Sequence, residues 1–140
     1  MKLTPKEYEV MRILWNSKTP MTIPEIIRAS PDRTWTEKGI YNIVTSMLGK
    51  EAVVRFTGVP TRSNTAKFIR PAISVEEYVA MQVLDVDLEM DIVAVFGAIL
   101  DKKSVDEATL ERMRRMLDRV KPVDKAIKDN IHEHIEEKDD

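Results

Sequence analysis

Apolar residues recur every three or four positions through three segments near the start of the chain, a spacing that predicts amphipathic helices. We expect these helices over residues 5–16, 23–29 and 35–50. The apolar positions of the third form one stripe that would face a core: Ile40, Ile43, Val44, Met47 and Leu48. On the first helix the side chains expected to be buried are Tyr8, Met11, Leu14 and Trp15.

Capping boxes mark the starts of the predicted helices. In this motif a Ser or Thr hydroxyl accepts a hydrogen bond from the backbone N–H three residues on, where a Glu stands. The pattern occurs at Thr4/Glu7, Thr22/Glu25, Thr34/Glu37, Ser74/Glu77 and Ser104/Glu107. A single box is a weak signal, but a series in which each box opens a helical pattern is a strong one.

The pattern changes after residue 52, where two short runs rich in β-branched and aromatic residues flank a polar segment. The runs cover residues 53–56 and 65–69, and Gly58 and Pro60 lie between them. Two such runs around a polar tip predict a β-hairpin. The order of three helices and a hairpin predicts a winged helix-turn-helix domain.

Beyond Ser74 helical spacing continues, and no proline occurs from residue 72 to residue 121. We expect one helix from Ser74 to about Ile99 and a second from Val105 to Val120. Two amphipathic helices of this length cannot close a core alone, so they need a partner, most simply a second copy of the chain. The predicted fold class is mainly α with a small β-hairpin wing.

The expected organisation is a winged-helix DNA-binding domain over 1–72, a helical dimerisation region over 73–121 and an acidic, frayed helical tail over 122–140. Charge follows this division. Residues 1–71 hold 12 Lys and Arg against 6 Asp and Glu, a net charge of +6, whereas residues 72–140 hold 10 against 18, a net charge of -8. The overall charge of -2 therefore hides two halves that suit different partners.

The composition also excludes several functions. The chain has no Cys, so disulfides, thiol nucleophiles and Cys-ligated metals are excluded. It has no phosphate-binding loop, nucleophile elbow or zincin motif, and we expect no enzyme activity and no cofactor. His132 and His134 point about 200° apart on a helix, which favours a solvated tail over a metal site. Without an apolar run of about 20 residues or a signal peptide, we expect a soluble cytoplasmic protein.

The candidate site residues lie on the third helix and the hairpin. With the apolar stripe inward, the outward residues suited to contacts in a DNA groove are Lys38, Tyr41, Asn42 and Thr45. The alternative for this face is packing against another protein. From residue 52 to residue 75 there is no acid, and the cations expected on the DNA backbone are Arg55, Arg62 and Lys67. For Trp35 we favour packing at the start of the third helix over an indole contact with phosphate.

Four segments together resemble the penicillinase-repressor family of winged-helix regulators. They cover residues 3–15, 22–26, 35–48 and 68–78. The resemblance implies a dimeric transcriptional repressor that binds double-stranded DNA at a palindromic operator. The alternatives are a winged-helix protein-interaction module and a ligand-sensing regulator with weak DNA binding, whose pocket would lie between the wing domain and the dimer helices.

The chain departs from the family pattern at several positions. Where the family usually has Thr, Arg and Lys-Gly, this sequence has Gly39, Ser46 and Lys50-Glu51. The Asn-Phe bond that is cleaved in antibiotic-responsive members is absent, and so are the C-terminal cysteines of copper-responsive members. Neither inducing mechanism carries over, and a sensor or protease partner is not identified by the sequence.

Overall fold

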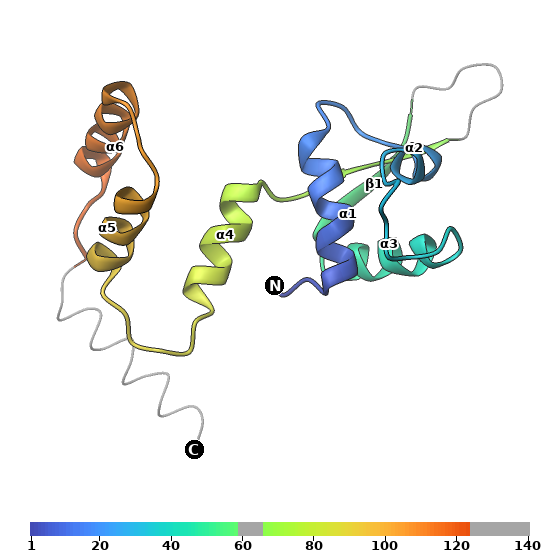
Figure 1. Cartoon of the computed structure of the whole chain (residues 1–140), viewed down its shortest axis with the longest axis horizontal. Coiled ribbons are helices and arrows are strands. Elements are labelled where there is room, and N and C mark those ends of the chain that lie inside the picture. The colour runs from blue at the N-terminus through green and yellow to red at the C-terminus, as the bar shows by residue number, and fades with distance from the viewer. Residues whose placement is uncertain (59–65, 124–140) are drawn as a thin grey trace. The chain divides into compact units, whose positions relative to one another are not determined.

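The computed structural model describes residues 1–58 and 66–123, which divide between Asp87 and Leu88 into two compact units. Helices and one two-stranded antiparallel sheet make up the described part, which confirms the predicted fold class (Figure 1). The elements are α1 (Pro5–Asn16), α2 (Ile23–Arg28), α3 (Gly39–Gly49), β1 (Val53–Thr57), β2 (Lys67–Pro71), α4 (Val75–Leu84), α5 (Ile92–Lys102) and α6 (Glu107–Arg119).

The core of the first unit lies where α1, α2, α3 and the hairpin meet. Its buried apolar side chains are Leu3, Val10, Met11, Leu14, Met21, Ile26, Trp35, Ile40, Val44, Met47, Ala52, Val53 and Ile69. The predicted stripe of α3 is confirmed, because Ile40, Val44 and Met47 are buried, and Ile43 and Leu48 pack partly buried against them. Burial of this stripe fixes which side of α3 remains exposed.

The hairpin is joined to the helices through its second strand. Ile69 pairs with Arg55 of β1, and on its other side it exchanges backbone hydrogen bonds with Met21 at 2.8 and 2.9 Å. Just after β1, a Cβ at Gly58 would lie 2.3 Å from the Phe68 ring. Any side chain at this position would therefore require the Phe68 ring to move.

Three of the predicted capping boxes begin helices as expected. The hydroxyls of Thr4, Thr22 and Ser74 accept hydrogen bonds from the backbone N–H three residues on, at 3.2, 3.3 and 3.0 Å. Helices α1, α2 and α4 therefore each begin at the residue after the predicted cap. Each hydroxyl satisfies a backbone donor that the helix itself leaves free.

The capping box at Thr34 was a wrong prediction. Helix α3 begins at Gly39, whose N–H donates to the Thr36 hydroxyl at 3.0 Å. The N–H and the hydroxyl of Thr34 both donate to the Glu9 carboxylate, and this contact holds Thr34 in the loop that precedes the helix. Helix α3 thus begins four residues after the expected start at residue 35.

The capping box at Ser104 was also wrong. Asp106 caps α6 instead, where its carboxylate accepts from the Thr109 N–H at 2.8 Å. Hydrogen bonds from Thr109, first from its side chain and then from its backbone, lower the pKa of the Asp106 carboxyl. An ionised Asp is a strong cap, because it also interacts favourably with the positive end of the helix dipole.

The single long helix predicted after Ser74 is interrupted. Helix α4 ends before Asp85, and α5 begins after Asp91, whose carboxylate accepts from Val93 N and Ala94 N at 2.9 and 3.4 Å. Leu88 continues the three- and four-residue spacing of apolar positions between α4 and α5, and this made the segment look helical. Its side chain is nevertheless 76% exposed. Aspartate is a poor residue for a helix interior and a good one for a cap, so the acid-rich segment 85–91 breaks the helix.

Tyr8 was expected in the core, but it is 43% exposed and lies in an aromatic cluster at the surface of the first unit. Its ring centroid lies 6.0 Å from that of Tyr78 and 6.2 Å from that of Trp15. The indole N–H of Trp15 donates to the Ile73 carbonyl at 3.0 Å. These contacts pack the start of α4 on α1. The boundary predicted at residue 72 separates a DNA-binding region from a dimerisation region, whereas the compact units divide between Asp87 and Leu88. The functional boundary stays a prediction.

Some predicted features lie outside the described residues. These are Arg62 in the hairpin tip and the tail helix with His132 and His134. Within residues 1–58 and 66–123, no helix has the length and apolar character that crossing a membrane requires.

A Schellman motif ends α3 and leads into the wing. The N–H of Ala52 donates to the Met47 carbonyl at 2.9 Å, and that of Glu51 donates to the Leu48 carbonyl at 3.0 Å. This motif places its penultimate residue in the left-handed region that favours glycine. Here that residue is Glu51, with φ of 60°, the one non-glycine residue with positive φ in the described part of the chain.

Replacing Glu51 with Gly should therefore raise the free energy of unfolding by about 1 kcal/mol, because glycine takes up positive φ without a steric cost from Cβ. Urea denaturation followed by circular dichroism measures this. Glu51→Ala is the matched control, since it removes the charge but keeps the Cβ, and it should change stability little. Equal stabilisation by both variants would assign the effect to charge at the end of α3 instead.

Candidate nucleic-acid interface

The outward side of α3 carries the four residues predicted to enter a DNA groove. Lys38, Tyr41, Asn42 and Thr45 are all exposed, and their spacing of three and four residues places them on one side of the helix. Tyr41 is 58% exposed although it is large and apolar in part. The structure thus brings these four side chains together opposite the buried stripe.

The Thr45 hydroxyl is already engaged, because it donates to the Tyr41 carbonyl at 2.8 Å. Its hydrogen is used within the helix, while its oxygen lone pairs and its methyl group remain available. Thr45 can therefore accept a hydrogen bond or contact a thymine methyl group, but it does not offer a free donor.

Helix α1 holds the segment in front of α3 through Glu9. One carboxylate oxygen accepts from the Thr34 N–H at 3.0 Å, and the other accepts from the Thr34 hydroxyl at 2.7 Å. Hydrogen bonds to a charged acceptor are stronger than neutral ones. The loop between α2 and α3 is thereby attached to α1 at a fixed point, five residues before α3 begins.

Helix α1 also holds the end of α3 through Glu7. Lys50 Nζ lies 2.7 Å from Glu7 Oε1 and donates to the Lys2 carbonyl at 2.9 Å. The Glu7 side chain is only 3% exposed, and Lys50 is 31% exposed. The second oxygen, Glu7 Oε2, is buried and has no partner among the described residues. The Lys50 ammonium is thus the main compensation for a buried carboxylate.

The hairpin carries two of the three predicted backbone contacts in the described residues, Arg55 and Lys67, and both are exposed. Arg55 lies opposite Ile69 and Lys67 opposite Thr57, two positions along, so both cations lie on one face of the hairpin. No carboxylate of the described residues forms an ion pair with either of them or with Lys38. Their charge is not neutralised within that part of the chain.

Trp35 packs at the start of α3, as favoured from the sequence. It is 4% exposed, and its indole N–H is buried without a hydrogen-bond partner in the described part. The alternative, an indole contact with phosphate, is wrong for this conformation because the nitrogen is covered. Arg33 lies over the ring at 5.5 Å from its centroid, and its guanidinium also reaches Glu37 at 3.5 Å.

Sequence reasoning missed the supports of α3. The Glu9–Thr34 contact joins residues 25 positions apart and the Glu7–Lys50 contact joins residues 43 apart, and no local pattern marks either. Glu51, whose φ is positive, did leave a signal in the sequence, as a departure from the Lys-Gly pattern that the family resemblance implies.

Helices α1 to α3, an antiparallel hairpin and an exposed polar side on α3 define a winged helix-turn-helix regulator. The family model described as "Penicillinase repressor" matches residues 3–119. The chain therefore belongs to the penicillinase-repressor family, a family of DNA-binding transcriptional regulators and not of enzymes.

More distant similarity is found among solved structures. One MepR mutant of S. aureus is 15% identical with a TM-score of 0.43, over 84% of this chain and 76% of that chain. A second, from a multidrug-resistant S. aureus clinical isolate, is 14% identical with a TM-score of 0.42, over 84% and 77%. No curated protein matches the chain. Membership of the family rests on the family model.

The buried pair between α1 and α3 predicts a strong effect of removing one partner. Lys50→Met should lower the free energy of unfolding by about 3 kcal/mol, because it leaves the Glu7 carboxylate buried without a cation. Adding Glu7→Gln to this variant should restore part of the loss. Thermal or urea denaturation measures both.

Lys6→Met serves as the control, since Lys6 is an exposed lysine of the same helix as Glu7. A loss of stability in Lys6→Met equal to that in Lys50→Met would argue against a specific role for the buried pair.

Proposed function

We propose that this regulator binds double-stranded DNA as a homodimer at a palindromic operator and represses transcription there. The observation that carries the proposal is the exposed side of α3, where Lys38, Tyr41, Asn42 and Thr45 lie opposite a buried apolar stripe. A helix that is buried on one side and offers polar groups on the other can enter the major groove.

In this proposal the contacts divide into two kinds. Asn42 pairs with two atoms of an adenine, Lys38 donates to guanine, and Tyr41 and Thr45 contact phosphate or a thymine methyl group. Arg55, Arg62 and Lys67 bind phosphates along the wing. The support for this second group is the absence of acids from residue 52 to residue 75 and the exposure of Arg55 and Lys67.

The homodimer is supported by the apolar side chains that the C-terminal helices leave uncovered. Helices α4, α5 and α6 contain no buried residue. Their exposed large apolar side chains are Val75, Val79, Leu84, Ile92, Val93, Phe96, Ile99, Met116 and Leu117. So much uncovered apolar surface is unfavourable in water, and a second copy of the same helices would cover it.

Substitutions should distinguish residues that contact bases from residues that contact phosphates. Asn42→Ala should cost about 1–3 kcal/mol and relax the preference at one base pair. Lys67→Ala should weaken binding to all sequences alike and reduce the slope of log K against log salt by about 1. Fluorescence anisotropy with a DNA selected from a random pool measures both.

Lys103→Ala is the control, because Lys103 follows α5 in the second unit and is exposed. If wild type shows no salt-dependent DNA binding at all, the proposal fails in favour of the protein-interaction module. If Asn42→Ala behaves like Lys103→Ala, the base contact is wrongly assigned.

The homodimer predicts that a charge in the exposed apolar surface separates the copies. Leu117→Glu, at a side chain that is 61% exposed, should give a monomer in sedimentation analysis and weaken operator binding at least about tenfold. Arg115→Glu places the same charge on a polar part of α6 and should leave the dimer intact. A Leu117→Glu variant that sediments like the wild type would contradict the proposed interface.

A further inference from the structure

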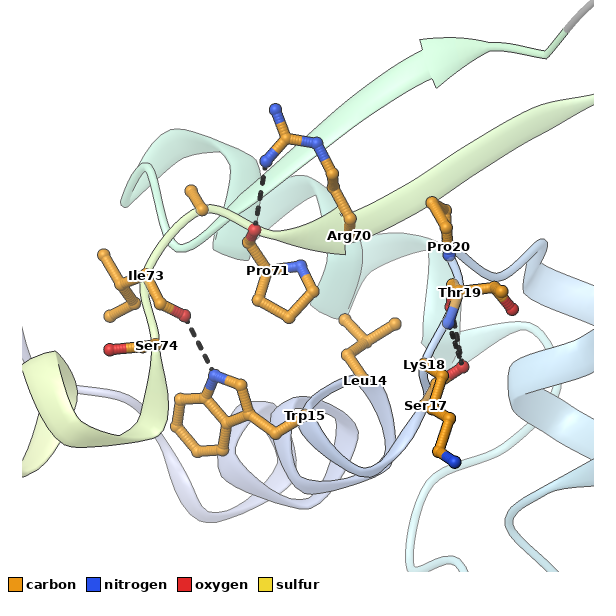
Figure 2. A pocket seen from close by; sticks show the side chains of 11 residues that line it. Leu14, Trp15, Ser17, Lys18, Thr19, Pro20, Arg70, Pro71, Ile73 and Ser74 are labelled. Atoms are coloured by element: carbon orange, nitrogen blue, oxygen red, sulfur yellow. Dashed lines mark hydrogen bonds between the residues drawn. The ribbon is translucent and has the colours of Figure 1, made fainter.

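A cavity of about 370 Å³ lies in the first unit, outside the proposed DNA-binding side. Its walls come from the end of α1, the connection from α1 to α2, the end of β2 and the connection from β2 to α4. Figure 2 shows Leu14 and Trp15 of α1 on one side, Pro71 facing them, and Thr19 and Pro20 closing another side. Segments more than 50 residues apart in sequence therefore form one concave surface.

The walls combine apolar groups with positive charge. Leu14, Trp15, Pro20, Pro71 and Ile73 supply apolar and aromatic surface. Lys18 and Arg70 belong to the lining, whereas no Asp or Glu does, although the chain contains 24 of them. Both cations are exposed, and neither forms an ion pair within the described residues. This chemistry matches a small molecule with an apolar ring and one negative charge.

One hydrogen bond joins two walls of the cavity, and two more lie within single walls. The indole N–H of Trp15 donates to the Ile73 carbonyl at 3.0 Å, which joins α1 to the segment before α4 (Figure 2). The Ser17 hydroxyl donates to the Thr19 carbonyl at 2.6 Å and fixes the turn after α1. Arg70 donates to the Pro71 carbonyl at 3.3 Å along the rim. A pocket already shaped in the free protein needs little reorganisation to accept a ligand.

The position of the cavity indicates what a bound molecule would do. The winged-helix core supplies one wall, and residues Ile73 and Ser74, which come just before α4, supply the other. Trp15 also packs against Tyr78 of α4, with ring centroids 5.5 Å apart. A molecule between these walls contacts both at once, so its binding depends on how α4 is attached to the core. That dependence is the requirement for coupling to a second site.

We propose that this cavity is an effector site for a small aromatic carboxylate. The ring lies against Trp15 and Pro71, and the carboxylate is attracted by the positive charges of Lys18 and Arg70, whose side chains extend from different sides of the rim (Figure 2). The site itself is independent of DNA, whereas its role as an effector site rests on the proposed function. Benzoate is a suitable probe, because a single ring with one carboxylate fits a volume of this size.

The first experiment is a titration of the ¹⁵N-labelled full chain with benzoate, followed by the two indole N–H signals in NMR spectra. Trp15 lines the cavity and Trp35 does not, so the signal of Trp35 is an internal control. We expect the Trp15 signal to move in a saturable way and the Trp35 signal to stay in place. Benzyl alcohol, the uncharged match, should bind at least about threefold more weakly.

Variants then test the cationic rim. Lys18→Gln with Arg70→Gln should weaken benzoate binding about fivefold while leaving the affinity for benzyl alcohol unchanged, because exposed ion pairs contribute modestly. Arg28→Gln, at an exposed arginine that does not line the cavity, should leave both unchanged. Equal binding of benzoate and benzyl alcohol, or no movement of the Trp15 signal, would overturn the site.

Coupling is measured separately as the DNA affinity with and without saturating benzoate at constant ionic strength. A change of about fivefold or more is expected for an effector, and the double variant should need about five times more benzoate than wild type to reach it. Binding of benzoate with unchanged DNA affinity would overturn the effector role and leave the DNA-binding function standing. Absence of all DNA binding would contradict the proposed function, while the NMR titration would still decide the site.

Discussion

The position of the proposed recognition helix depends on two carboxylates of a different helix. Glu9 binds Thr34 before α3, and Glu7 binds Lys50 after it. Both acids belong to α1, so this one helix holds the chain on either side of α3. The buried stripe decides which side of α3 faces outward, and the two contacts with α1 decide where α3 lies along α1. A groove-binding face needs both kinds of constraint.

Local interactions were predictable from the sequence. The caps at Thr4, Thr22 and Ser74 involve residues three apart, and the stripe on α3 follows helical periodicity, so both could be recognised without knowing the fold. Errors arose where a local pattern competed with another interaction. Thr34 looked like a cap but is used by Glu9, which lies 25 residues away. No single-sequence pattern contains that information.

The candidate site was predictable to the same extent. The exposed side of α3 follows from its buried side, so the grouping of Lys38, Tyr41, Asn42 and Thr45 could be foreseen. The engaged hydroxyl of Thr45 and the covered indole nitrogen of Trp35 could not, because they depend on atomic placement. The cavity beside Trp15 is also a product of tertiary structure, since its walls come from segments that are distant in the sequence.

The pairing of Ile69 with Met21 has a consequence for solubility. A two-stranded sheet presents open edges to which another chain can add a strand. Along β2, Met21 occupies the middle of the outer edge, Lys67 places a charge at one end, and Pro71 lacks an N–H at the other. The outer edge of β2 therefore offers no continuous row of free backbone groups for aggregation, which suits a protein whose C-terminal helices already expose apolar side chains.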